Sequence, residues 1–183
     1  MAKLISKTYG DALFEIAVEE NKPEKILEEV TDLLNVIRED KDFKKFMDSP
    51  KVPKEEKIKV VENVFTDRLD KDTLGFLVTI IEKDRYEEIE AILQYVIDEI
   101  KEYLSIGTAY IVTATPLTNE EKEMTKNKLL QTTKYKKIEC NYDVDASIIG
   151  GMIIRMKDKV VDSSVRNKLE KLERELLNVQ LAN

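Results

Sequence analysis

The chain has 183 residues, of which 42% are hydrophobic and 37% are Asp, Glu, Lys or Arg. This is enough for one or two globular domains with their own cores. The sequence has no histidine and only one cysteine, so it lacks the usual general base at neutral pH, the most common zinc ligand and any internal disulfide. We therefore expect a protein that is not an enzyme and that binds no metal or cofactor.

Two features indicate that the chain does not insert into a membrane. Its longest apolar run, around residues 148–154, is far shorter than the roughly 20 residues that cross a bilayer. The chain also opens without a basic and apolar leader segment. From these features we expect a cytoplasmic protein.

The chain changes character near Ser105, where helical spacing of apolar residues stops and a β-branched run begins. We predict two domains, residues 1–105 and residues 106–183. The first carries 17 Lys and Arg against 26 Asp and Glu, for a net charge of −9, and the second carries 13 against 11, for a net charge of +2. Because the charges differ in sign, we expect the two domains to face different partners.

The first domain is predicted to be an all-α bundle of six helices, because its apolar residues recur every three or four positions. Pro23 is typical of a first helical turn and opens the second helix. Pro50 and Pro53 separate the third helix from the fourth. The fifth and sixth helices are predicted around residues 74–81 and 89–104.

The fifth helix has apolar residues on several sides, so it needs neighbours on several sides. Two interpretations remain open. It is either a central helix buried by the rest of the bundle, or one wall of a groove that also receives a helix from another protein.

The second domain is predicted to be a small α+β unit, which makes the fold class of the whole chain α+β. We predict strands at residues 108–113 and 137–144, a hairpin at 152–161 and a final helix. A further helix follows Thr118, where Thr118-Asn119-Glu120-Glu121 has the form of a capping box.

The C-terminal segment joins a glycine pair, a hairpin and an amphipathic helix. Lys157-Asp158-Lys159 forms the turn of the hairpin, and Asp162-Ser163-Ser164 provides oxygens that cap the helix. We interpret these serines as a cap and not as a nucleophile, because no histidine is present to accept a proton. The helix carries an apolar seam of Val165, Leu169, Leu172, Leu176 and Val179.

This segment resembles the C-terminal signature of the delta subunit of bacterial F-type ATP synthase, the counterpart of the mitochondrial oligomycin-sensitivity-conferring protein. Lys157 departs from the family pattern, which usually has a glycine that allows positive φ. The opening helix, through Tyr9, Ala12 and Leu13, and the segment from Phe76 onward also resemble the family. The matching signature residues are Gly150, Gly151, Arg155, Asp158, Asp162, Ser164 and Arg166.

The resemblance implies a stator subunit without catalytic activity of its own. Such a subunit links the peripheral stalk to the top of the alpha/beta catalytic head, and so resists rotor torque during proton- or sodium-driven ATP synthesis. The resemblance also implies one copy per complex, at the cytoplasmic face of the cell membrane and without direct membrane insertion.

Two docking sites are implied by the resemblance. The first is a groove between the first and fifth helices for the N-terminal helix of an alpha subunit, with walls formed by Tyr9, Ala12, Leu13, Ile16, Phe76, Leu77, Ile80 and Ile81. The second binds the C-terminal ends of the b subunits through Val165, Leu169, Leu172 and Leu176. For this seam, packing on the domain's own sheet is the alternative interpretation.

A nucleic-acid-binding helical module is the alternative function. It is suggested by the basic run Lys134-Tyr135-Lys136-Lys137 and by the Arg and Lys residues of the last helix. The acidic first domain argues against it, because carboxylates repel phosphates, and no aromatic-rich binding motif accompanies the basic run. We therefore expect no nucleic-acid partner.

Overall fold

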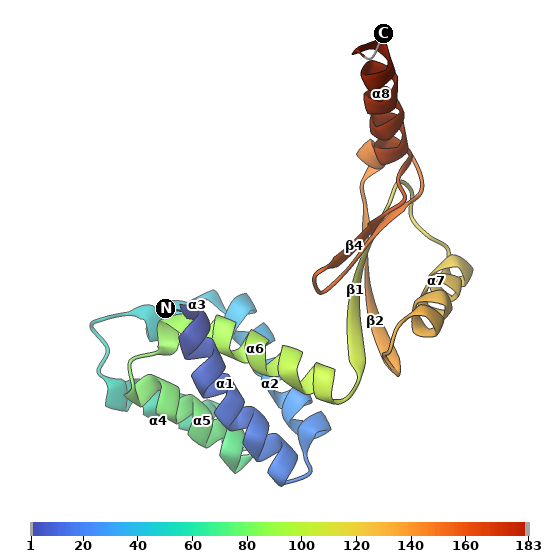
Figure 1. Ribbon diagram of the computed structural model, residues 1–183. Helices are drawn as coiled ribbons and strands as arrows, with labels where there is room; N and C mark the ends of the chain where they lie inside the picture. The colour runs from blue at the N-terminus through green and yellow to red at the C-terminus, as the bar shows by residue number, and fades with distance from the viewer. Residues whose placement is uncertain (1, 182–183) are drawn as a thin grey trace. The chain divides into compact units, whose positions relative to one another are not determined.

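The computed structural model of the protein describes residues 2–181, and it describes the side chains of residues 4–175 and 177. The chain divides between Leu104 and Ser105 into two compact units. Unit 1 is helical, whereas unit 2 combines a sheet with helices (Figure 1). The predicted α+β fold class is confirmed.

Unit 1 contains, within its described residues, the six predicted α-helices and one short 3-10 helix, η1. The 3-10 helix was not predicted, because three residues are too few to show a period. The bounds are α1 Ala2–Glu19, α2 Pro23–Glu39, α3 Lys41–Asp48, α4 Lys54–Phe65, α5 Lys71–Glu82, η1 Tyr86–Glu88 and α6 Ile89–Tyr103.

Local signals set where several of these helices begin. Pro23 occupies the first turn of α2, where its missing N–H costs no hydrogen bond. The Asp40 carboxylate accepts hydrogen bonds from the backbone N–H groups of Asp42 and Phe43, at 3.0 and 2.9 Å, and so caps α3. Asp70 caps α5 by accepting from the N–H of Lys71 at 2.7 Å.

The core of unit 1 is centred on α6, which packs against α1 and α2. The helix α1 approaches α6 closely at Gly10, where a Cβ atom would lie 2.3 Å from the ring of Tyr95. The Tyr95 hydroxyl also donates to the Asp11 carboxylate at 2.7 Å. The fully buried α6 side chains are Ile92, Leu93, Val96 and Ile100.

A buried carboxylate joins α2 to the start of α5. Glu29 is only 8% exposed, and it accepts hydrogen bonds from the Asp70 N–H at 3.0 Å and from the Thr73 hydroxyl at 2.7 Å. The Lys25 ammonium lies 3.7 Å from the other carboxylate oxygen. Because a buried charge needs such partners, these contacts hold the two helices in one arrangement.

Unit 2 contains a sheet with strand order β2-β1-β3-β4. β1 and β2 are parallel and are joined by α7, whereas β3 runs antiparallel to both β1 and β4. The bounds are β1 Ile106–Thr113, α7 Asn119–Thr132, β2 Lys137–Val144, η2 Ala146–Ile148, β3 Met152–Met156, β4 Lys159–Asp162 and α8 Val165–Leu181. The predicted strands and the capping box of α7 are therefore confirmed.

The core of unit 2 is small and lies between α7 and one face of the sheet. Ala109, Ile111 and Ile138 are buried, and the half-buried Leu129 and Leu130 of α7 pack against them. The four residues of β4 are all exposed. Ile154 and Met156 of β3 also pack against this core, whereas β4 and α8 contribute little to it.

Candidate partner-binding surfaces

The predicted groove between α1 and α5 is made mostly of core residues. Leu13, Phe76, Leu77, Ile80 and Ile81 are buried, with exposed fractions between 0% and 9%. On α5 the buried residues follow a spacing of three and four, so they point together into the bundle. These five side chains support the two helices from inside, and we correct their assignment as surface contacts.

Fewer of the predicted groove residues are accessible to a partner than the sequence indicated. On α1, Ala12 is exposed, and Tyr9 and Ile16 are half-buried. On α5, Gly75 is exposed, and a Cβ atom there would have no neighbour within 4 Å. Sequence reasoning missed Gly75, although a glycine inside a helix costs about 1 kcal/mol relative to alanine and so suggests a close backbone approach.

The helix α8 leaves its apolar seam uncovered. Leu169 and Leu172 are 53% and 55% exposed, Val165 is half-buried, and the side chain of Leu176 lies outside the described part. α8 packs against η2, and Figure 1 shows it standing at the end of the sheet, away from α7. Packing of the seam on the domain's own sheet is therefore wrong for Leu169 and Leu172.

The glycine pair of the signature has a structural role. Gly151 has a φ of +77°, and a Cβ atom there would lie 2.4 Å from the carbonyl oxygen of Ser163. The Gly150 carbonyl accepts a hydrogen bond from the N–H of Val165 at 2.9 Å. The pair thus lets the start of β3 pass directly beside the start of α8.

The start of α8, beside this glycine pair, is held in place by a helix cap. Ser164 is 2% exposed, and its hydroxyl accepts from the N–H of Asn167 at 3.1 Å. The Asp162 carboxylate accepts from the N–H of Ser164 at 2.9 Å. Hydrogen bonds from the Ser164 hydroxyl and N–H lower the pKa of Asp162. These residues form the cap that was predicted, and Arg166 pairs with Glu170 one turn later.

The hairpin turn contains Lys157, at the position where the family resemblance leads us to expect a glycine. Lys157 has a φ of +48°, the left-handed conformation that glycine adopts most easily. The turn therefore keeps its tight form, and the lysine carries the backbone strain. Arg155 and Asp158 are both exposed, on β3 and in the turn.

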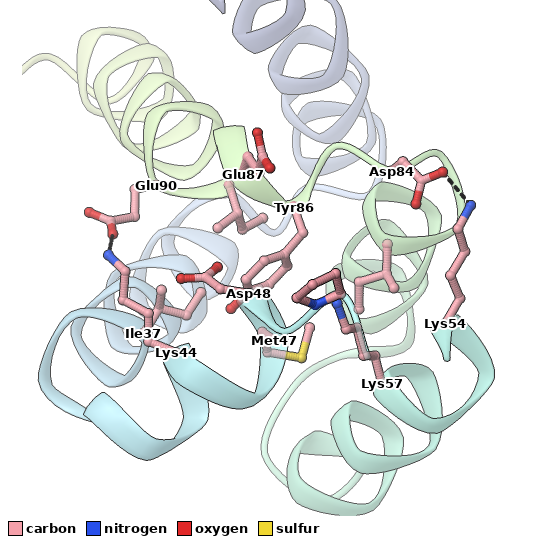
Figure 2. A pocket seen from close by; sticks show the side chains of 13 residues that line it. Ile37, Lys44, Met47, Asp48, Lys54, Lys57, Asp84, Tyr86, Glu87 and Glu90 are labelled. Carbon is pink, nitrogen blue, oxygen red and sulfur yellow. Dashed lines mark hydrogen bonds and ion pairs between the residues drawn. The ribbon is translucent and has the colours of Figure 1, made fainter. Parts of the chain in front are cut away.

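A cavity of about 500 Å³ lies between α3, the start of α4 and η1 (Figure 2). Tyr86 lines it, and its hydroxyl is buried without a hydrogen-bond partner. Burial, with Asp48 and Glu90 nearby, raises the pKa of Tyr86. Two ion pairs border the cavity, Lys44 with Glu90 at 2.7 Å and Lys54 with Asp84 at 2.5 Å. They connect α3 and α4 to the segment around η1.

The basic run that suggested nucleic-acid binding leads into β2. The Lys134 ammonium lies 5.7 Å from the centre of the Tyr135 ring, and Tyr135 packs against the core of unit 2. The N–H of Lys136 donates to the Ser105 carbonyl at 2.9 Å. These contacts give the run a structural role at the start of the strand.

Among the described residues, no three His, Cys, Asp or Glu side chains gather closely enough to hold a metal ion. In the same part of the chain, every helix is too short or too polar to span a bilayer.

The fold and its surfaces thus define a two-unit α+β protein with exposed helix surfaces on both units. Residues 5–176 match the family "ATP synthase delta (OSCP) subunit", and the chain belongs to this family. Members of this family are structural subunits of the synthase and not its catalytic subunits.

Similar proteins cover nearly the whole chain. A protein of Lachnoclostridium phytofermentans named ATP synthase subunit delta is 49% identical over 99% of this chain and 100% of its own length. A protein of Alkaliphilus oremlandii with the same name is 32% identical over 98% and 99%. A chain in the mitochondrial ATP synthase hexamer of Toxoplasma gondii has a TM-score of 0.75 at 21% identity, covering 94% of this chain and 97% of that one, and so shares the fold.

Proposed function

We propose that this chain is the stator subunit that connects the peripheral stalk to the top of the catalytic head of an ATP synthase. Unit 1 binds the N-terminal helix of an alpha subunit along α1 and α5, and unit 2 binds the C-terminal ends of the b subunits along α8. One copy per complex, at the cytoplasmic face of the membrane, resists the torque of the rotor during ATP synthesis driven by protons or sodium ions.

The observation that carries this proposal is the uncovered seam of α8 on one compact unit, combined with a second, oppositely charged unit. A leucine row that is more than half exposed is costly in water, so it favours a helical partner. Two binding surfaces on separate units suit a mechanical link, because the loss of either surface breaks the connection.

The proposal is tested by calorimetric titration of the full chain with two peptides, one copying the N-terminal helix of the cognate alpha subunit and one copying the C-terminal end of the b subunit. We expect Ala12→Asp to weaken binding of the alpha peptide at least tenfold, because Ala12 is exposed on α1. Leu172→Asp should do the same to the b peptide.

Each variant serves as the control for the other, because each alters one unit only. Asn127→Asp on the exposed side of α7 adds the same charge elsewhere and should leave both affinities within about twofold. If both folded variants bind both peptides as the parent does, the two docking surfaces are wrongly placed.

A further inference from the structure

A second groove on unit 1 lies between α2 and the end of α4, and neither the family resemblance nor the proposed function uses it. Its volume is about 610 Å³. Its apolar part combines the buried Leu33 and Phe65 with the half-buried Val36 and Leu69. Val64, on the same end of α4, is 43% exposed.

The α2 side of this groove carries a row of carboxylates beside Lys25, whose ammonium is paired with Asp70 at 2.6 Å. Glu28, Asp32 and Glu39 are exposed and follow one another at intervals of four and seven residues, so they lie along one side of the helix over about 16 Å. Within the described part of the chain, none of the three has an ion-pair or hydrogen-bond partner for its side chain. Their charge is therefore available to a partner.

The charge of this row selects the kind of occupant. Phosphates of nucleic acids and anionic lipids are repelled by it. A second copy of the same acidic face is repelled in the same way, since unit 1 has a net charge close to −9. A basic helix with one apolar side satisfies both parts of the groove, because its lysines or arginines meet the carboxylates while its apolar side covers Val36 and Leu69.

We propose that the groove between α2 and α4 is a second docking site on unit 1, and that it binds a basic amphipathic helix of a partner protein. The site is separate from the surface of α1 and α5, and this proposal does not depend on the proposed function.

The charges also set the direction of the bound helix. Arg68 lies near the start of α2, because Asp70, two residues after it, is paired with Lys25 of α2 at 2.6 Å. Glu39 is the last residue of α2 and lies at the opposite end of the groove. A helix carries partial positive charge at its N-terminus and partial negative charge at its C-terminus. The bound helix therefore places its N-terminus near Glu39 and its C-terminus near Arg68.

The test uses the full chain and a designed peptide of about 18 residues, long enough to hold a helix. The peptide carries leucines every three or four positions and lysines along one flank, and a matched peptide carries glutamates in place of the lysines. We expect the lysine peptide to shift the backbone amide signals of residues 28–39 and 64–69, and a spin label on its N-terminus to broaden the signals around Glu39. The glutamate peptide should not bind.

Charge-reversed variants distinguish binding in the groove from a general electrostatic attraction between the lysine peptide and the acidic protein. Glu28→Lys combined with Asp32→Lys should weaken binding of the lysine peptide at least tenfold. The control, Glu123→Lys combined with Asp143→Lys, makes the same change in net charge on exposed residues of unit 2 and should weaken it by less than about threefold. Ala12→Asp should leave this binding unchanged, which distinguishes the site from the one on α1 and α5.

Several results would overturn the proposal. They are the absence of binding, equal binding of the two peptides, amide shifts centred on α1, α5 or α8, or equal loss of affinity in both charge-reversed proteins. Sedimentation could also reveal a dimer that the Val36→Glu substitution dissociates. This result would show that a second copy of the chain occupies the groove, and it would overturn the proposal as well.

Discussion

Two tyrosines of unit 1 differ in whether their buried or half-buried hydroxyl has a hydrogen-bond partner. The Tyr95 hydroxyl donates to Asp11 at 2.7 Å, and this bond raises the pKa of Tyr95 to about 12. The Tyr86 hydroxyl is buried and has no partner. A buried polar group without a partner costs free energy, so the two hydroxyls have effects of opposite sign on stability.

We predict that Tyr86→Phe raises the free energy of unfolding by up to about 1 kcal/mol, because it removes an unsatisfied hydroxyl from beside the cavity. Tyr95→Phe is the matched control and should lower it by about 1 kcal/mol. Urea denaturation followed by circular dichroism measures both. Destabilisation by Tyr86→Phe would mean that the hydroxyl has a partner in solution, such as an ordered water molecule.

The turn between β3 and β4 provides a second test at the scale of one residue. Lys157 holds a φ of +48°, so we predict that Lys157→Gly raises the free energy of unfolding of unit 2 by about 0.5–1 kcal/mol. Lys159→Gly, two residues later in β4, should have the opposite sign, because glycine weakens a strand. Equal destabilisation by both variants would show that the left-handed conformation at Lys157 costs nothing.

At the scale of elements, the start of α5 is held by charge as well as by its cap. The Lys25 ammonium donates to Asp70 at 2.6 Å, and this bond, followed by the Lys71 N–H, lowers the pKa of Asp70 from 3.8 to about 2. In the folded state Asp70 therefore stays ionised at pH values at which it protonates in the unfolded chain. Its contribution to stability is present above pH 4 and is lost as the pH falls from about 4 to about 2.

We predict that Asp70→Asn destabilises unit 1 at neutral pH, and that its difference from the parent closes between about pH 4 and pH 2. Asparagine keeps the helix cap and removes the ion pair, so the effect isolates the charge. Denaturation midpoints across this pH range provide the measurement. A pH-independent difference for Asp70→Asn would exclude the ion pair with Lys25 as its cause.

At the scale of the whole molecule, the two units have cores that share no residue. Ile92 lies in the first core and Ile111 in the second, with exposed fractions of 0% and 1%. Removing one methyl group from a buried isoleucine costs about 0.5–1.5 kcal/mol.

We predict that Ile92→Val and Ile111→Val each destabilise only their own unit. Amide signals of each unit, followed by NMR during denaturation, report the two transitions separately. Ile92→Val should shift the transition of residues 2–104 and leave that of residues 105–181 in place, and Ile111→Val should do the reverse. A common shift of both transitions in either variant would show that the units unfold together.

The local sequence determined the elements of this protein, and through the matching motifs it determined the family. The period of the apolar residues, Pro23 and the capping box at Thr118 predicted helices and strands close to their observed bounds, because these signals act within one or two turns of the chain. The glycine pair and the Asp162 cap also lie at the positions that the sequence indicated, since both act where the start of β3 passes the start of α8.

Only the tertiary structure decided which apolar residues face outward. Leu13 and Leu172 both belong to regular apolar rows, yet Leu13 is 0% exposed and Leu172 is 55% exposed. The contacts between Glu29, Asp70 and Thr73, and the groove between α2 and α4, also join residues distant in sequence. Helical period shows that a residue lies on an apolar side, but burial depends on whether another element covers that side, and this depends on how distant segments pack.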